Sequence, residues 1–209
     1  MPNPWEEIPL SDYENHMKLD SVMQLQTMNH MMEGQLNTSY PVSSVIILGI
    51  AGGNGLEHID KNKFQKVYGI DINSEYLKTV KERYSDISDI LECMRIDLIQ
   101  ESNKLPKAEL LIANLLIEYI GYECFRKAVE QIQPKYVSCI IQINVDNSWV
   151  SDSQYIHVFD DLAKVHHQME ENLLIQILKS IEYKLIGQKE RLLPNGKKLV
   201  QLDFVHIDI

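Results

Sequence analysis

Three polar side chains follow hydrophobic segments of the kind that form buried strands. Asp71 ends the segment FQKVYGID, Asp97 ends ILECMRID, and Asn114 ends AELLIAN. Ligands of open parallel α/β sheets bind at the carboxyl ends of the strands, so these residues are candidates for one binding site. A carboxylate at the first position can accept hydrogen bonds from both vicinal hydroxyls of a ribose. Each residue alone could be a solvated strand end, whereas three in register favour a nucleoside-like ligand.

A turn of small residues precedes these positions. The strand-like run at residues 45–48 is followed by the turn at 49–55 (GIAGGNG), and helical spacing begins at Leu56. This order brings the backbone close to a bound nucleotide, because a Cβ in the turn would hold the ligand away. A tight structural turn is the alternative. Asp71 follows the turn by about the distance expected of a ribose-binding acid.

Hydrophobic and helical segments alternate along most of the chain. Strands are predicted at residues 45–48, 64–71, 90–97, 108–114 and 136–145, and helices at 74–84, 122–132 and, for the most part, 157–180. This alternation predicts a parallel sheet with right-handed crossovers. Two further strands at 183–193 and 198–209 flank Pro-Asn-Gly, a strong hairpin signal. The sequence therefore predicts an α/β fold whose seven-stranded sheet is mostly parallel with an antiparallel C-terminal hairpin strand.

Residues 1–40 have a different composition. Three prolines keep the first nine residues irregular, and residues 11–32 have the amphipathic spacing of a methionine-rich helix, with caps expected at 11 or 12 and at 20 or 21. Such a segment either packs onto the domain or forms a lid, where flexible methionines adapt to an apolar substrate. In a lid, Tyr13, His16 and Met17 would face the pocket. The sequence thus predicts a helical extension or lid at 1–40 and the main domain at 41–209.

The composition restricts the partners of this 209-residue chain. Its formal net charge is −10, and no dense block of lysine and arginine is visible. A nucleic-acid partner is therefore disfavoured, and a small molecule or a protein surface is favoured. Whether the chain forms a homodimer stays open.

The three cysteines predict neither a metal site nor disulfides. Cys93, Cys124 and Cys139 are far apart in sequence, and no pair has the spacing of metal ligands. Cys93 and Cys139 lie in apolar runs, which predicts buried thiols in a reducing compartment. The first residues lack a signal-peptide layout and no apolar run has the length of a membrane span, so we expect a cytoplasmic location without a membrane partner.

With these features, residues 44–209 resemble the class I S-adenosylmethionine-dependent methyltransferases. The glycine turn, Asp71, Asp97 and the terminal hairpin carry the resemblance. It implies a Rossmann-like three-layer α/β/α sandwich whose reversed last strand separates it from NAD-binding domains. The NAD fingerprint also fails, because it needs a small residue where His58 stands. The segments WEEIPLSDYENHM and NLLIEYIG further resemble a group of small bacterial methyltransferases, which implies no particular substrate.

The family's first motif is an acid, a spacer and Gly-x-Gly-x-Gly. Aligned on the last two glycines, Gly53 and Gly55 match, and Ala51 replaces the first glycine. Gly49 stands where the family has the acid that helps to hold the methionine ammonium. Backbone carbonyls or a residue of the N-terminal segment could take over that role.

The resemblance assigns the remaining donor contacts to strand ends. Asp71, followed by Ile72, matches the ribose-binding acid, and Asp97 with Leu98 matches the adenine contact. Asn114 stands where the family presents the reactive methyl. The implied cofactor is S-adenosylmethionine, and the product is S-adenosylhomocysteine.

The function predicted from these features is methyl transfer to a small-molecule acceptor. In-line displacement requires positioning and exclusion of water, and a general base is needed only if the acceptor keeps a proton until attack. The candidate catalytic residues are Glu118, His16 and Tyr13, with His166 as a further candidate base. Glu118 could instead be an acid that satisfies amides at a helix start.

Two observations bear on the acceptor and leave several functions open. Residues 147–161, with Trp149, Tyr155 and Phe159, could complete an acceptor pocket or form a surface loop. Asn114 is not followed by the Pro-Pro-aromatic stretch of enzymes that methylate exocyclic amines of nucleobases, so that activity is disfavoured. The alternatives are a protein acceptor, an aminopropyl transferase, and a non-catalytic nucleoside-binding or regulatory module on the same fold.

Overall fold

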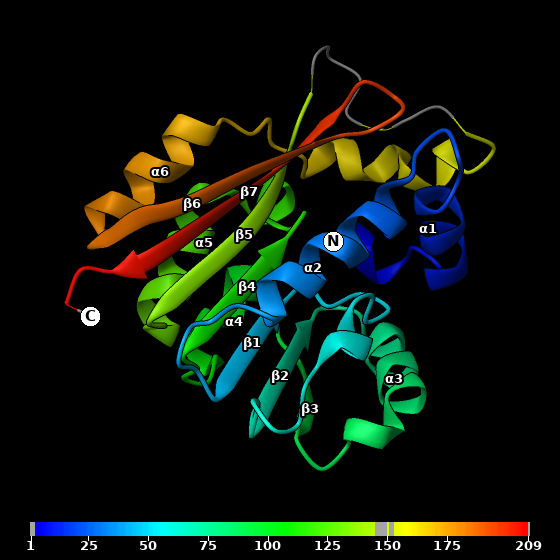
Figure 1. The fold of residues 1–209 in the computed structure, drawn as a ribbon. Helices are drawn as coiled ribbons and strands as arrows, with labels where there is room; N and C mark the ends of the chain where they lie inside the picture. The colour runs from blue at the N-terminus through cyan, green and yellow to red at the C-terminus, as the bar shows by residue number, and fades with distance from the viewer. Residues whose placement is uncertain (1–2, 145–149, 151–152, 209) are drawn as a thin grey trace.

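The fold is built on one seven-stranded sheet, seen in a computed structural model that describes residues 3–144, 150 and 153–208 (Figure 1). The strands lie in the order β3-β2-β1-β4-β5-β7-β6. Their bounds are β1 Ser44–Leu48, β2 Lys66–Asp71, β3 Leu91–Arg95, β4 Leu110–Asn114, β5 Tyr136–Ile143, β6 Tyr183–Leu192 and β7 Lys198–His206. The first five strands are parallel, and β7 pairs antiparallel with both β5 and β6. The predicted mostly parallel sheet with its C-terminal hairpin is confirmed.

Helices cover both faces of this sheet. The α-helices are α1 Leu10–Met17, α2 Gln24–Leu36, α3 Ser74–Arg83, α4 Leu98–Glu101, α5 Ile117–Ile132 and α6 Glu171–Ser180. The 3-10 helices are η1 Pro4–Glu6, η2 Leu56–His58, η3 Ser85–Ile87, η4 Ser102–Lys104 and η5 Ile156–Lys164. Among the described residues, we find no helix with the length and apolar character that a membrane crossing needs.

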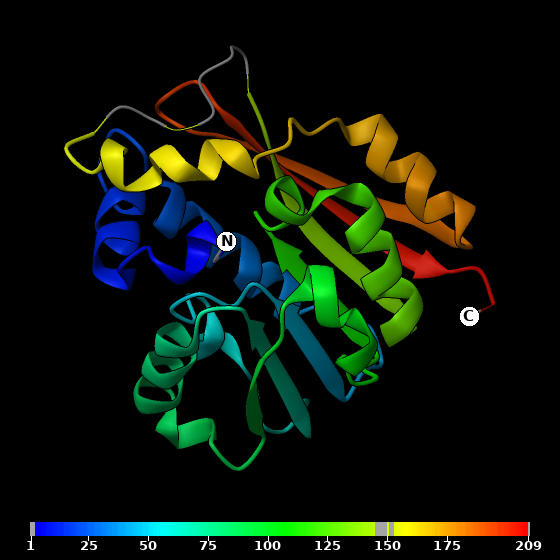
Figure 2. The same cartoon turned by 180° about the vertical axis from the view of Figure 1, so that it is seen from behind.

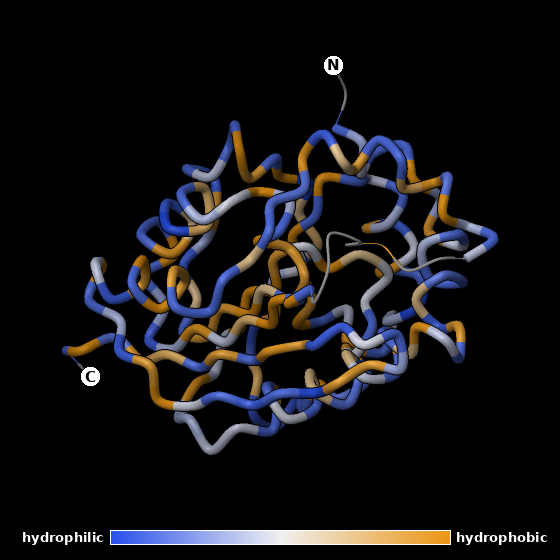
Figure 3. The backbone as a smooth tube through the Cα atoms, turned by 90° about the horizontal axis from the view of Figure 1, so that it is seen from above, coloured by the Kyte–Doolittle hydropathy of each residue, from blue (hydrophilic) through white to orange (hydrophobic). Residues whose placement is uncertain are grey.

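The two-residue period of the strands explains the two cores. Along β1, Ile46 and Leu48 point to one face and pack with α5 and α6, whereas Val45 and Ile47 point to the other face and pack with α2 and α3. Figure 2 shows α5 and α6 on their face of the sheet. In Figure 3 hydrophobic stretches of the chain gather in the middle of the molecule, while its outer turns alternate between hydrophilic and hydrophobic colours. The result is the three-layer sandwich that the sequence predicted.

The N-terminal segment forms two helices rather than the single one expected. α1 begins after Pro9, and α2 begins after Met23, whose φ of 51° lies in the left-handed region. The predicted caps at residues 11–12 and 20–21 are therefore wrong. This break lets α2 pack on the sheet through Met32 and Leu36, while α1 lies at the carboxyl end of the strands. The division of the chain at residue 40 stays a prediction.

The helix expected after the glycine turn is reduced to the single 3-10 turn η2. η2 ends at His58, and the chain turns again at Asp60, whose carboxylate accepts a hydrogen bond from the backbone N–H of Asn62 at 2.8 Å. Such a side-chain bond to the backbone favours a turn over a helix. Met32 of α2 and Leu56 of η2 belong to the same core, so α2 supplies the apolar cover on this side.

The helix predicted at 122–132 is confirmed as the part of α5 that follows Gly121, whose φ of 75° interrupts the helical geometry. The helical piece of α5 before Gly121, which begins at Ile117, was not predicted. The next helical segment differs from the prediction. The segment expected to be mostly helical at 157–180 is divided into η5 and α6. His166 and His167 lie in the connection between these two elements rather than inside a helix.

Candidate functional site

Three cavities adjoin one another at the carboxyl ends of β1, β2 and β4. The β2 cavity, beside Asp71, has a volume of about 700 Å³. The glycine-turn cavity, beside Gly52, has about 610 Å³, and the α5 cavity, beside Glu118, has about 570 Å³. These volumes include space open to solvent. Tyr13 and Leu115 line all three, so the cavities meet at these two side chains.

The β2 cavity contains the two acids predicted from the strand ends. The Oδ2 atom of Asp71 accepts a hydrogen bond from the backbone N–H of Ala51 at 2.9 Å, and Oδ1 accepts one from Asn73 at 2.9 Å. Burial raises the pKa of Asp71 to about 6, against the opposing effect of these N–H groups. Asp97 caps α4 by accepting from the backbone N–H of Ile99 at 2.9 Å. The predicted contacts Ile72 and Leu98 line the same cavity.

Two non-glycine residues at this edge have left-handed backbones. The φ of Ala51 is 46° and that of Leu115 is 52°. Such conformations cost on the order of 1–3 kcal/mol and cluster at functional sites. At Ala51 this conformation accompanies the hydrogen bond from its N–H to Asp71. The positive φ explains why the first motif of the methyltransferase family has glycine at this position. At Leu115 it follows directly on β4, where the three cavities meet.

The glycines of the turn have different neighbours. Gly49 lines the β2 and glycine-turn cavities. Gly53 and Gly55 face the protein itself, because an added Cβ would lie 2.6 Å from a ring carbon of Tyr84 and 2.7 Å from the sulfur of Met32, respectively. Their positive φ values, 82° and 95°, also require glycine. The turn therefore needs these two glycines for its own packing, and their contact with a ligand stays a prediction.

The side chain of Asn114 is engaged with α2. Its Nδ2 donates to Oε1 of Gln35 at 2.8 Å, and Nε2 of Gln35 donates back to Oδ1 of Asn114 at 3.0 Å. Gln35 also donates to Ser138 at 2.9 Å, and Ser138 donates to Asp203 of β7. This buried network fixes α2 to the sheet. Asn114 lines the β2 and glycine-turn cavities while its amide is held in this way.

Glu14, which was not among the predicted site residues, reaches the glycine turn from α1. Arg83 of α3 holds it through two hydrogen bonds, one of them 2.9 Å from Nη2 to Oε2, and also donates to the carbonyl of Gly52 at 3.1 Å. A Cβ at Gly52 would collide with Oε1 of Glu14, so glycine admits this approach. Glu14 lines the glycine-turn cavity together with Gly49 and Asn114. A carboxylate thus lines the same cavity as Gly49, the position where the methyltransferase motif has its acid.

The start of the chain is fixed over these cavities by α3. The Nδ2 of Asn73 donates to the carbonyl of Trp5 at 2.9 Å, and the hydroxyl of Tyr76 donates to the carbonyl of Ile8 at 2.7 Å. Trp5, which the sequence analysis also missed, contacts Tyr119 edge to face at 4.8 Å between ring centroids and Tyr13 at 5.6 Å. These three aromatic rings line both the β2 and α5 cavities.

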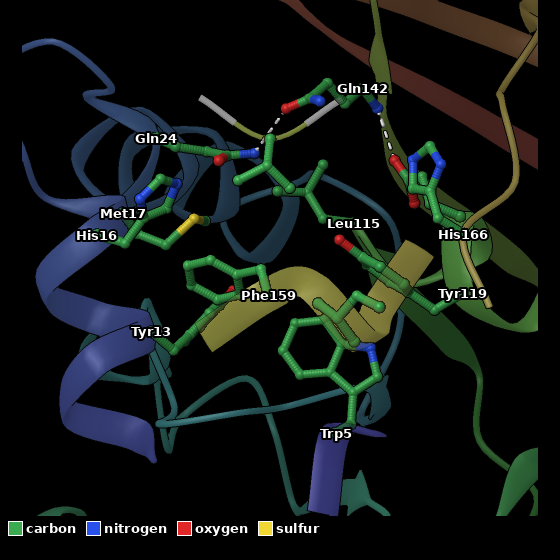
Figure 4. Close-up of a pocket in the computed structure, with 13 residues that line it drawn as sticks. Trp5, Tyr13, His16, Met17, Gln24, Leu115, Tyr119, Gln142, Phe159 and His166 are labelled. Carbon is green, nitrogen blue, oxygen red and sulfur yellow. Dashed lines mark hydrogen bonds between the residues drawn. The ribbon is translucent and has the colours of Figure 1, made fainter. Parts of the chain in front are cut away.

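The α5 cavity brings together side chains from distant parts of the sequence. Figure 4 shows Trp5, Tyr13 and Phe159 on one side of it and Gln142 and His166 on another. The cavity is lined by all three candidate catalytic residues, Tyr13, His16 and Glu118. The predicted pocket residues Met17 and Phe159 line it as well. Tyr155 belongs to the apolar cluster of Phe159, and Trp149 lies outside the described residues.

Glu118 is the buried acid of this cavity. Glu118 is only 3% exposed. Its Oε1 accepts a hydrogen bond from the backbone N–H of Gln142 at 2.7 Å. Within the described part of the chain, Oε2 has no hydrogen-bond partner. Burial raises the pKa of Glu118 to about 7, although the N–H of Gln142 opposes the rise. The carboxyl group can therefore both hold and release a proton near neutral pH.

The two histidines of the α5 cavity are neutral at pH 7. Burial lowers the pKa of His166 to about 4, with smaller contributions from the neighbouring His167 and from Lys197. Burial also lowers the pKa of His16, whose Nδ1 lies 2.8 Å from Oγ of Ser153. Neither imidazole therefore adds positive charge to the cavity.

Comparison with known proteins identifies the fold. No protein-family model matches the chain, and a search of curated proteins finds no match. Solved structures do match. Magnesium protoporphyrin IX methyltransferase from Synechocystis PCC 6803, with bound S-adenosylmethionine, has a TM-score of 0.59 at 12% identity over 88% of this chain and 78% of its own. The chain has the class I S-adenosylmethionine-dependent methyltransferase fold.

Other neighbours share this methyltransferase fold. Geranyl diphosphate C-methyltransferase from Streptomyces coelicolor A3(2) has a TM-score of 0.64 at 6% identity, over 88% of this chain and 81% of its own. The cyclase SpnF has a TM-score of 0.65 at 7% identity, over 88% and 82%. At these identities the likeness establishes the fold, and a cyclase among the neighbours means that the activity must be argued from the site.

Proposed function

We propose that the protein is an S-adenosylmethionine-dependent methyltransferase that acts on a small molecule. One observation carries the proposal: the β2 cavity with its two acids, the glycine-turn cavity and the aromatic α5 cavity meet at Tyr13 and Leu115, at the end of β4. A donor in the first two would have its reactive end beside the third. Two neighbours on this fold, named for magnesium protoporphyrin IX and geranyl diphosphate, are methyltransferases of small molecules.

The residues that line the cavities fit the parts of S-adenosylmethionine. Asp71 would accept hydrogen bonds from the ribose hydroxyls, and Asp97 with Leu98 would contact the adenine. Glu14, held by Arg83 at the glycine turn, would receive the methionine ammonium in place of the acid absent at Gly49. When bound, the donor supplies a methyl group on a positively charged sulfur.

The protein's part in the reaction is positioning and the exclusion of water. Trp5 and Tyr13 close the junction of the cavities, and Leu115 follows β4 in a fixed, left-handed conformation. Glu118 is the one acid among the described residues that line the α5 cavity, and with a pKa of about 7 it can take a proton from an acceptor near neutral pH. We therefore assign it the role of general base.

Calorimetric titration tests the donor site. We expect micromolar binding of S-adenosylmethionine and S-adenosylhomocysteine, no binding of NAD, and a loss of roughly 1–3 kcal/mol in Asp71→Asn, the scale of a charged hydrogen-bond partner. Asp89→Asn, an exposed acid paired with Lys61, is the matched control. Binding of NAD alone, or an unchanged affinity in Asp71→Asn, would refute the assignment. Donor binding with no methyl transfer to any metabolite of an extract would favour the non-catalytic nucleoside-binding module.

A further inference from the structure

The carboxyl group of Glu118 lacks half of the hydrogen bonding that a buried acid needs. Oε1 is satisfied by the N–H of Gln142, but Oε2 has no partner among the residues described, although the residue is 3% exposed. A buried polar atom without a partner costs free energy and is rare in folded proteins. The unpaired oxygen therefore indicates that a ligand donates a hydrogen bond to it.

The walls around Glu118 fit a positively charged ligand. Trp5, Tyr13, Tyr119 and Phe159 line the cavity and present four aromatic rings, whose faces attract cations. The described lining residues include no lysine or arginine. Lys197 acts on the pKa values of nearby histidines but is not one of the lining residues.

The net charge of the chain favours the same ligand. With a formal net charge of −10, the protein attracts cations and repels anions over distances of about 10 Å at 0.1 M salt. A buried acid, aromatic walls and a negative surface therefore all select for positive charge.

We propose that the methyl acceptor is a small amine, bound as its ammonium ion between Oε2 of Glu118 and the aromatic rings of the α5 cavity. This inference rests on the proposed function and names the chemical class of its substrate. The ammonium would satisfy the unpaired oxygen and restore the charge balance of the cavity. A neutral hydroxyl could also donate to Oε2, but it would gain nothing from the four rings.

The amine also gives Glu118 its chemical role. One proton passes from the ammonium to Oε2 and leaves the carboxyl group neutral. The freed nitrogen lone pair forms the N–C bond with the methyl carbon while the C–S bond breaks, and its electron pair stays on sulfur. The sulfonium becomes a neutral thioether, and the product carries its positive charge on nitrogen. The total charge before and after the transfer is the same.

Binding of simple amines and their alcohol counterparts tests this inference. The probes are benzylamine with benzyl alcohol and 2-phenylethylamine with 2-phenylethanol, titrated at pH 8 into protein saturated with S-adenosylhomocysteine. We expect at least one amine to bind wild type at least tenfold more tightly than its alcohol. Glu118→Gln, which keeps an oxygen for the N–H of Gln142, should lose that preference. Trp5→Leu should reduce it, because it removes one aromatic face.

The matched control is Glu130→Gln, which removes one negative charge from an exposed position on the same helix. It should keep the wild-type preference for amines. Equal binding of amine and alcohol to wild type, no binding of any probe, or a preference that survives in Glu118→Gln would overturn the amine proposal. The S-adenosylhomocysteine titration is read separately, so a failure of the donor site itself is distinguished from a failure of the acceptor assignment.

Discussion

Replacing Glu118 by glutamine should stabilise the protein at alkaline pH. An ordinary glutamate has a pKa of 4.5, whereas burial raises that of Glu118 to about 7. At about 1.4 kcal/mol for each unit of pKa, ionising this carboxyl in the folded protein costs about 3 kcal/mol. Glutamine has the shape of the neutral acid and avoids the cost. We therefore expect the free energy of unfolding of Glu118→Gln to exceed that of wild type by about 3 kcal/mol at pH 8.

The dependence on pH follows from the direction of the shift. Since the folded protein binds the Glu118 proton more tightly than the unfolded chain does, the contribution of Glu118 to stability falls as pH rises from 4.5 to 7. The advantage of the variant should therefore shrink to about 1 kcal/mol at pH 5. Asp71, whose pKa is also raised, is present in both proteins and cancels in the comparison.

Urea unfolding followed by circular dichroism at pH 5 and pH 8 measures both values. Glu130→Gln, at an exposed ion pair with Arg126, should stay within about 0.5 kcal/mol of wild type at each pH. A Glu118→Gln variant less stable than wild type at pH 8, or one with the same difference at both pH values, would refute the argument. In that case Oε2 would have a protein partner, and the acceptor proposal would lose its basis.

Two further variants test the glycine turn. Glu14→Gln should weaken the calorimetric affinity for S-adenosylhomocysteine by roughly 1–3 kcal/mol. The affinity for 5′-methylthioadenosine, which has no amino-acid tail, should stay unchanged. An equal loss of affinity for both ligands would show that Glu14 acts by positioning α1. Gly55→Ala should lower the free energy of unfolding by about 1–3 kcal/mol, because φ is 95° and the new Cβ would lie 2.7 Å from the sulfur of Met32. Gly34→Ala, where the nearest atom to an added Cβ is 3.9 Å away, is its control, and equal stability of the two variants would contradict this reading of the turn.

Much of the sheet could be predicted because its signals are local. A buried parallel strand is a short run of β-branched and aliphatic residues, and Val45–Leu48 and AELLIAN are such runs. Asp71 and Asp97 could be predicted as site residues because polar side chains at parallel strand ends share one edge of the sheet. The Asn-Gly turn likewise predicted the C-terminal hairpin.

The helical layer was predicted less well, because its breaks depend on contacts distant in sequence. Met23 adopts a left-handed backbone inside an amphipathic pattern that continues across it. The cover after the glycine turn comes from α2 rather than from the residues that follow the turn. Helical periodicity reports which residues are apolar but not which neighbour they pack against.

The sequence by itself determined the order of the strands along the chain, the glycine turn and the two acids of the β2 cavity, since each depends on residues adjacent in sequence. Only the tertiary structure placed Glu14 at the glycine turn, Trp5 against Tyr119, and Glu118 in a cavity where one of its oxygens has no partner among the described residues. The physical reason is that charge and burial are properties of a position in space. The pKa of Glu118 is set by the loss of water around it, which involves α1, η5 and β5 and has no trace in the residues beside it in the chain.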